Sequence, residues 1–293
     1  MHRSGRGSRH ATWSALATLA GALFSAAPAL ADSVSAYASA FSNTGWLFPE
    51  QATGTPNGGC ASGAGSAQTL TLTGFGFAIP STAIVDSIQV RPKARGADTA
   101  NSIGLRLMLD GGLVGNSKSV SIQTSSGGWS CADTAFADSS ADLWGTTWTA
   151  AQINSGTFGV RMTAHSSGNG MGVDAVQIVV NYTPLVDLNL GFTGDGSGSV
   201  NLDPPDTDCS SPCTESYAVG TGVTLTQTPA PGSVASGFGG DPDCADGQVT
   251  LTATLSCTAI FRTETIFVDG FEMGDYCEWS RHSPDGGECN LIR

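Results

Sequence analysis

A short loop with three aspartates is the segment of this 293-residue chain whose residue types best suit ligand chemistry. Asp241, Asp243 and Asp246 precede Gly247, and Ca²⁺ takes several oxygen ligands from loops of this kind. The spacing departs from that of an EF-hand loop, and Thr252 stands where the closing glutamate would be. Acidic residues in turns usually serve only to form a solvated turn. We therefore expect no cofactor, and calcium at this loop is the alternative.

Groups for acid–base or nucleophilic catalysis are scarce. Only His165 and His282 follow residue 31, whereas a hydrolase triad needs a nucleophile, a base and an orienting acid in contact. The segment nearest to a G-x-S-x-G elbow, around Ser130, lacks the final glycine, and no phosphate-binding loop or H-E-x-x-H motif is present. His165 follows an apparent strand and is interpreted as an exposed turn residue. We predict a non-catalytic protein, with a secreted hydrolase that uses His165 as the lesser alternative.

Tryptophan offers another route to ligand binding, because its ring has a flat apolar face that can stack on a sugar. Trp129 lies in the glycine- and serine-rich segment 125–130, next to Cys131, and is the tryptophan we most expect to be exposed. Trp144 and Trp148 are instead expected to pack at the rim of a sandwich. A carbohydrate-binding module with Trp129 as its contact residue is thus a second functional hypothesis.

The eight cysteines fall into pairs, all of them downstream of an export signal. Three pairs are close in sequence and the fourth is left by elimination: Cys209 with Cys213, Cys244 with Cys257, Cys277 with Cys289, and Cys60 with Cys131. Such a set predicts disulfides, which need an oxidising compartment. The alternative of a zinc half-site at the C-x-x-x-C spacing lacks nearby histidines.

The first 31 residues have the features of a signal peptide. Arg3, Arg6 and Arg9 give a positive start, residues 15–27 are apolar, and Ala-Leu-Ala at 29–31 is a cleavage motif. The apolar run is short for a membrane span, and no later run is long enough to cross one. We expect a mature chain from Asp32 that is secreted or held at the cell surface. An uncleaved N-terminal anchor is the alternative.

The charge of the chain excludes some partners. It carries 12 Lys and Arg against 25 Asp and Glu, and loss of the three arginines before residue 31 changes the net charge from −13 to −16. Negative charge of this size repels phosphate backbones and anionic lipids. Nucleic acid and membrane surfaces are therefore not expected partners, and a cell-surface glycan or protein is.

Alternation of apolar and polar residues predicts an all-β fold. It occurs in residues 84–95, where the even positions Ile84, Ile88, Val90 and Ala94 are apolar, and in 103–109, 158–164 and 176–182. Only residues 149–153 suggest a helical turn. Each sheet must bury one face, so these strands predict an antiparallel, jelly-roll-like β-sandwich over residues 32–184.

A boundary is expected at Pro184, because proline ends a strand. Residues 187–262 have few large apolar side chains, with alternation at Val223 and Leu225 and again over 249–255. We interpret them as a small β domain built of hairpins and stapled by two disulfides, since so small a core needs cross-links. By loop entropy, the Cys209–Cys213 link is worth about 2 kcal/mol and Cys60–Cys131 about 4 kcal/mol. Residues 263–293 form a tail clipped by Cys277 and Cys289.

The second domain resembles the divergent bacterial repeat that is related to the internalin B-repeat. The matching segments are 194–200 (GDGSGSV), 209–213 (CSSPC), 222–226 (GVTLT), 231–233 (PGS), 237–240 (GFGG) and 257–261 (CTAIF), together with Cys244. Phe238 stands where that family normally has tryptophan. The resemblance implies a small β-grasp-like or sandwich module that serves as a stalk or adhesive unit, without catalytic residues.

Two further resemblances lie in other parts of the chain. Residues 42–183 are similar to a β-sandwich module of secreted and phage-related bacterial proteins, through the segments 75–80 (FGFAIP), 84–88 (IVDSI), 143–145 (LWG), 148–149 (WT), 158–160 (FGV) and 173–174 (VD). Residues 266–272 (IFVDGFE) resemble an ending of exported bacterial proteins. The sequence therefore favours an exported, non-catalytic protein whose sandwich binds or assembles and whose repeat domain is a spacer. Its ligand and oligomeric state stay open.

Overall fold

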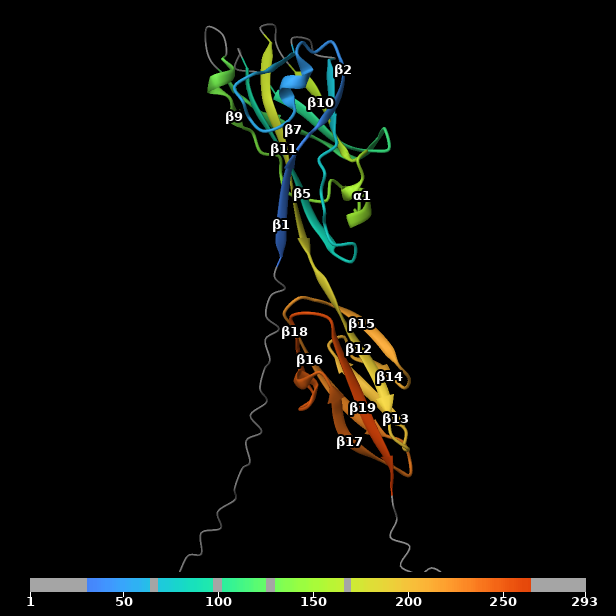
Figure 1. The fold of residues 1–293 in the computed structure, drawn as a ribbon. Coiled ribbons are helices and arrows are strands. Elements are labelled where there is room, and N and C mark those ends of the chain that lie inside the picture. Colours follow the sequence, from blue (N-terminus) through green and yellow to red (C-terminus); the bar gives the residue numbers. More distant parts are fainter. Residues whose placement is uncertain (1–30, 64–67, 97–101, 125–129, 166–169, 265–293) are drawn as a thin grey trace, which may run out of the picture.

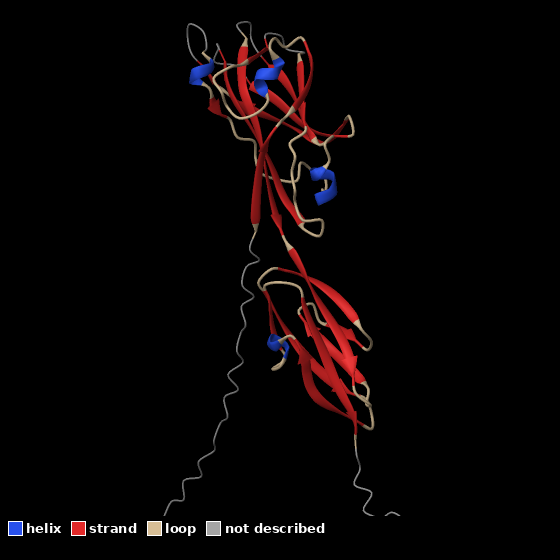
Figure 2. Cartoon of the chain, viewed as in Figure 1, coloured by secondary structure: helices blue, strands red, loops and turns tan. Residues whose placement is uncertain are grey.

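The computed structural model describes residues 31–63, 68–96, 102–124, 130–165 and 170–264 (Figure 1). The predicted signal peptide, the tail with Cys277 and Cys289, and Trp129 all lie outside these residues, apart from Ala31, Thr263 and Glu264. The described chain is all-β with a few short helical turns, which confirms the fold class expected from the alternation (Figure 2).

The first unit has two sheets. The first sheet contains β1 (Asp32–Tyr37), β11 (Met171–Thr183), β5 (Ile84–Gly96) and β8 (Gln123–Thr124), with β3 (Ala61–Gly63) beside β11 and β9 (Ala135–Phe136) beside β5. The second sheet has the order β2 (Ala40–Thr44), β4 (Thr69–Thr73), β10 (Gly159–His165), β6 (Ser102–Leu109), β7 (Gly112–Ser121). Short helices η1 (Pro49–Ala52), η2 (Cys131–Asp133) and α1 (Ala150–Asn154) lie between strands.

The two sheets enclose one apolar core. Alternate residues of the long strands β5, β6, β10 and β11 are buried in it. Phe75, Phe77, Phe158 and Trp148 form an aromatic cluster there, with ring centroids 5.4 to 6.5 Å apart. Period-2 alternation works here because successive side chains of a strand point to opposite faces, one toward the facing sheet and one toward solvent.

The helical turn expected at 149–153 is present as α1. Thr149 accepts a hydrogen bond from the amide of Gln152, and the Gln152 side chain accepts one from the amide of Thr149. This reciprocal pair is a capping box, which satisfies two amides that the first turn of a helix leaves free.

One detail of the predicted alternation is wrong at the start of β5. Ile84 was expected to share a face with Ile88, but it is 53% exposed, and Val85 is buried in its place. The pairing of β5 with β11 shifts between Asn181 and Tyr182. Such an irregularity moves the following residues to the opposite face of the sheet.

The second unit also has two sheets and its own core. One sheet has the order β15 (Cys213–Ala218), β12 (Leu185–Thr193), β19 (Leu255–Thr263), β17 (Ser233–Gly240), and the other has β14 (Thr207–Cys209), β13 (Gly198–Asp203), β16 (Thr221–Pro229), β18 (Gln248–Leu251). A short helix, η3 (Pro242–Cys244), precedes β18. Figure 1 shows this unit following the sandwich end to end.

The second unit departs from the simple hairpins that the alternation suggested. The run 249–255 is not one strand: it divides into β18 and β19, which belong to different sheets. In addition, β12 and β19 pair in parallel. Parallel neighbours are joined by a long connection, so this pairing cannot be inferred from short-range patterning.

The chain enters and leaves the sandwich at one end. Asp32, the first residue of β1, pairs with Tyr182 near the end of β11, and the Tyr182 hydroxyl donates a hydrogen bond of 3.0 Å to the Asp32 carboxylate. Only Pro184 separates β11 from β12. The amide of Val219 in the second unit donates to the carbonyl of Pro184, so the connection is tied to the domain that follows it.

Candidate functional site

Two arginines lie directly opposite each other on the outer face of the second sandwich sheet. Arg161 in β10 pairs in register with Arg106 in the antiparallel neighbour β6. The residues on either side of them in sequence, among them Leu105 and Met162, are buried in the core, so the arginine side chains belong to the outer face. Like charges directly opposite in a sheet are destabilising. The fold therefore tolerates an unfavourable pair at this position.

Neither arginine has a carboxylate partner within the described part of the chain. The Nε of Arg106 donates to the carbonyl of Gly115 at 3.1 Å. The Nε of Arg161 is buried and has no hydrogen-bond partner there. The ion pairs of the described residues use Arg91, Lys93 and Lys118 instead. An unpaired buried donor costs free energy, so the Arg161 guanidinium has bonding capacity that the protein does not use.

A shallow groove of about 400 Å³ runs beside the two arginines. Its lining combines polar and charged side chains with apolar surface, and it includes Gly104, Leu105, Arg106, Leu113, Lys118, Ser119, Arg161, Thr163 and His165. Strand β4 lies on the other side of β10 and contributes a further hydroxyl, because its Thr71 pairs in register with Arg161. The outer face thus combines guanidinium donors with hydroxyl groups that can both donate and accept.

Gly104 makes room for the imidazole of His165 at the floor of this groove. A Cβ at this position would lie 2.8 Å from Nε2 of His165 and 3.6 Å from the Cβ of Thr163. The imidazole therefore occupies the space above the glycine. A side chain at position 104 would have to displace it.

His165 differs slightly from the expected turn residue. It is the last residue of β10, it is exposed, and it lines the groove. Within the described chain it makes no hydrogen bond to a serine or a carboxylate, so the contacts that a hydrolase base needs are not seen among these residues. The hydrolase alternative stays a prediction.

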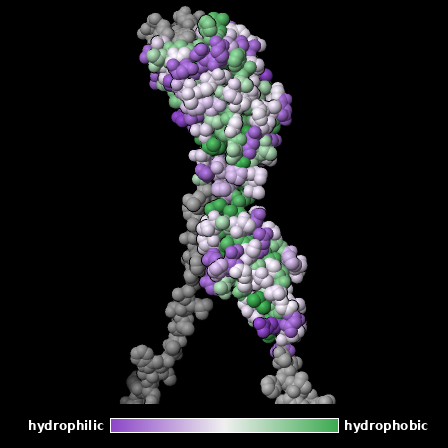
Figure 3. Space-filling model, viewed as in Figure 1, coloured by the Kyte–Doolittle hydropathy of each residue, from purple (hydrophilic) through white to green (hydrophobic). Residues whose placement is uncertain are grey.

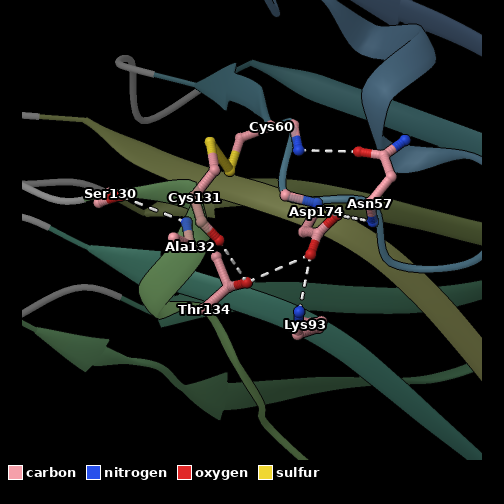
Figure 4. Close-up of a disulfide and its surroundings, with 10 residues drawn as sticks. Asn57, Cys60, Lys93, Ser130, Cys131, Ala132, Thr134 and Asp174 are labelled. Atoms are coloured by element: carbon pink, nitrogen blue, oxygen red, sulfur yellow. Dashed lines mark hydrogen bonds and ion pairs between the residues drawn. A yellow bond between two sulfur atoms is a disulfide. The ribbon is translucent and has the colours of Figure 1, made fainter.

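The end of the sandwich beyond the groove is held by a buried carboxylate. Asp174 in β11 is fully buried and accepts hydrogen bonds from the amides of Asn57 and Gly58, at 2.9 and 3.2 Å (Figure 4). Its other oxygen is 2.7 Å from Nζ of Lys93 and accepts a longer bond from the hydroxyl of Thr134. One side chain thereby joins two loops and two strands.

These contacts determine the charge state of Asp174. Burial by itself raises the pKa of its carboxyl, but the Lys93 ammonium and the amides of Asn57 and Gly58 favour the charged form more strongly, so the pKa lies below its ordinary value. The carboxylate is therefore a permanent anion near neutral pH.

A disulfide lies beside this network and links the same two loops. Cys60 and Cys131 are bonded, with their Cα atoms 5.6 Å apart. The Ser130 hydroxyl accepts a hydrogen bond from the amide of Ala132 at the start of η2 (Figure 4). The segment that follows Trp129 is thus anchored covalently and by hydrogen bonds. Trp129 itself lies outside the described residues, and its role as a sugar contact stays a prediction.

The other tryptophans of the sandwich are buried. The indole Nε1 of Trp144 donates to the carbonyl of Ile88 at 2.9 Å, and that of Trp148 donates to the carbonyl of Leu143 at 3.2 Å. Both rings pack in the core, whereas the sequence suggested packing at the rim of the sandwich. Trp46 is also buried there, so it offers no surface for stacking on a ligand.

The three aspartates of the expected calcium loop each bind backbone. Asp241 accepts a hydrogen bond from the amide of Ser256 at 2.7 Å and Asp243 one from Thr250 at 2.7 Å. Asp246 accepts one from the amide of Gln248 at 2.9 Å. Among the described residues, no group of three His, Cys, Asp or Glu side chains is arranged to hold a metal ion. Asp246 thus stabilises a turn, whereas Asp243 and Asp241 attach the loop to β18 and β19. Calcium at this loop stays a prediction.

The second unit contains two of the expected disulfides, Cys209–Cys213 and Cys244–Cys257. All cysteines of the described chain are bonded. Their presence agrees with an oxidising environment such as that outside the cytoplasm. In the same part of the chain, no helix has the length and apolar character needed to cross a membrane.

Comparisons with known proteins add little. No protein-family model matches the chain, and a search of curated proteins finds no match. Among solved structures, a chain of the cyanophage Pam1 capsid asymmetric unit is similar with a TM-score of 0.23 and 16% identity, over 60% of this chain and 96% of that chain. We base no functional argument on a likeness of this size.

Sequence reasoning missed the arginine pair. Arg106 and Arg161 each occupy a polar position between apolar neighbours, which places each of them on an outer face. That they lie opposite each other depends on the register between β6 and β10, and nothing in the local sequence of either strand gives that register.

Proposed function

We propose that the protein is an exported, non-catalytic binding protein of the cell surface or the extracellular space. In this proposal the sandwich provides the binding face, and the second unit is a disulfide-stapled spacer of the divergent bacterial repeat type. Three disulfides in the described chain support export, because such bonds persist mainly in oxidising compartments.

The observation that carries the proposal is the unused bonding capacity on the outer face of the second sandwich sheet. Arg161 has a buried donor without a partner, and it lies opposite a second arginine. A like-charge pair on a sheet face is unfavourable, and no carboxylate of the described chain pairs with either arginine, so a binding role accounts for the pair. Functional sites are where proteins retain such unfavourable local features.

The face of the molecule shown in Figure 3 has apolar and polar residues intermixed, with small groups of apolar residues among them. In the described chain the exposed large apolar residues are the consecutive Leu47 and Phe48 and the separate Phe41, Ile84, Leu113, Phe136 and Val234. Recognition through hydrogen bonds and charge is therefore favoured over hydrophobic docking.

The test uses the mature chain from Asp32, fluorescently labelled and applied to a glycan array and to isolated bacterial cell envelopes. We expect saturable binding that Thr163→Glu in the groove weakens and that Thr214→Glu, on β15 of the second unit, leaves unchanged. Binding that neither variant affects would show that the binding face lies elsewhere on the protein. Turnover of a glycan that is lost in His165→Ala would contradict the non-catalytic proposal.

A further inference from the structure

We propose that the Arg106–Arg161 pair binds the carboxylate of a uronic-acid-containing polysaccharide, with the sugar ring lying in the adjoining groove. This inference rests on the proposed binding function and specifies its ligand class. It assigns Arg161 as the main anion contact and Arg106 as the second cation.

The arginine pair favours an anion as the first element of the ligand. A carboxylate between the two guanidinium groups would supply acceptors for the terminal nitrogens of both side chains, which lie opposite each other beside the groove. Arginine presents its donors in a planar fork that matches a carboxylate with two parallel hydrogen bonds. Binding would also convert the repulsion between the two cations into attraction to a shared anion.

The surroundings of the pair favour a sugar as the second element. The groove places the hydroxyls of Ser119 and Thr163 beside the arginines, and Thr71 adds another across the strand. Hydroxyl groups both donate and accept hydrogen bonds, which matches the hydroxyls around a sugar ring. Leu113, 39% exposed, borders the same groove and offers an apolar contact for a ring face.

The charge of the whole molecule selects among anionic polymers. The chain has a net charge of −13, which repels a dense polyanion such as a nucleic acid or a heavily sulfated glycan beyond the groove itself. A polymer with at most one carboxylate per sugar carries less charge per sugar than a heavily sulfated glycan, and it meets Arg106, Arg161 and Lys118 in the groove. The uronate class therefore fits better than the sulfate or phosphate classes.

A protein partner, including a second copy of the chain, fits the groove less well. Protein interfaces have apolar cores enriched in Tyr, Trp and Phe, whereas none of these three residue types lines the groove in the described chain. A volume of about 400 Å³ suits one or two sugar units better than a protein surface.

The experiment measures binding of the mature full-length chain to polygalacturonate by calorimetry, with dextran as the neutral probe and heparin as the sulfated one. We expect polygalacturonate to bind best and added NaCl to weaken it. Arg161→Gln should weaken binding about tenfold or more, because a charge-assisted hydrogen bond is lost. Arg106→Gln should weaken it by a smaller factor.

The matched control is Arg91→Gln, which removes the same charge from the other sheet, where Arg91 pairs with Asp138. It should change polygalacturonate affinity by less than about twofold. The melting temperature separates binding from folding: Arg161→Gln should leave it unchanged or raise it, since the like-charge pair is removed.

Equal binding by Arg161→Gln and the parent chain would overturn the inference, as would a preference for heparin or arginine-dependent self-association in analytical ultracentrifugation. Binding to dextran or to cell envelopes in the absence of polygalacturonate binding would overturn the uronate assignment alone and leave the proposed binding function standing. Absence of binding to every probe and to envelopes would overturn both the uronate assignment and the proposed binding function.

Discussion

The two units of this chain are stabilised by different means. The sandwich buries more than twice as many apolar side chains as the second unit, and its core includes four clustered aromatic rings. In the second unit, Cys209, Cys244 and Cys257 are themselves part of the core. A large core can tolerate an uncompensated arginine pair on its surface, whereas a small core depends on covalent bonds. The arginine pair and the groove thus lie on the unit with the larger core.

Chemical reduction of the intact protein should produce the largest difference in stability between the two units. Loss of both links in the second unit removes about 5 kcal/mol by loop entropy, which is comparable with the whole stability of a small domain. The sandwich loses about 4 kcal/mol but retains its large core. We expect hydrogen exchange to show unprotected amides in β12 to β19 while β5, β10 and β11 stay protected. Earlier exchange in the sandwich would reverse the comparison.

Removal of the buried carboxylate tests the sandwich alone. Asp174→Ala should destabilise it by about 3 kcal/mol, because Lys93 and the amides of Asn57 and Gly58 lose their shared partner. Denaturant unfolding followed by the buried tryptophans measures this loss.

Asp138→Ala is the matched control, since Asp138 also lies 2.7 Å from a basic side chain but is about half exposed. It should cost less than about 1 kcal/mol. Equal effects of the two substitutions would show that burial of Asp174 does not increase the contribution of its contacts to stability.

Removal of the short cross-link tests the second unit alone. Cys209→Ser combined with Cys213→Ser should lower the stability of that unit by about 2 kcal/mol and leave unfolding of the sandwich unchanged. Domain-resolved hydrogen exchange distinguishes the two. A coupled loss in both units would show that they unfold together.

Acid should weaken the sandwich through Asp174. The folded-state pKa of this carboxyl is depressed, so its contribution to stability is complete above the unfolded value of about 3.9 and is lost as the pH falls through the lower folded value. We expect the melting temperature of the sandwich to fall below about pH 4. In Asp174→Asn this part of the pH dependence should disappear; an unchanged profile would assign the acid sensitivity to other groups.

The sequence predicted what depends on local chemistry. Strands such as β10 follow from period-2 alternation, α1 follows from Thr149 and Gln152, and the pairing of Cys244 with Cys257 follows from proximity in the chain. The parallel pairing of β12 with β19 and the opposition of Arg106 to Arg161 depend on contacts between distant segments. Local sequence patterns determine neither of these pairings. The candidate site could therefore not be predicted from the sequence alone.

The entry and exit of the chain at one end of the sandwich have a mechanical consequence. A pull applied between Asp32 and Thr183 acts on the adjacent ends of β1 and β11. It would load their hydrogen bonds one pair at a time, starting at Asp32 and Tyr182, instead of sharing the load along the whole ladder. Under tension, β1 would peel away before the disulfide-linked far end of the sandwich carried any force.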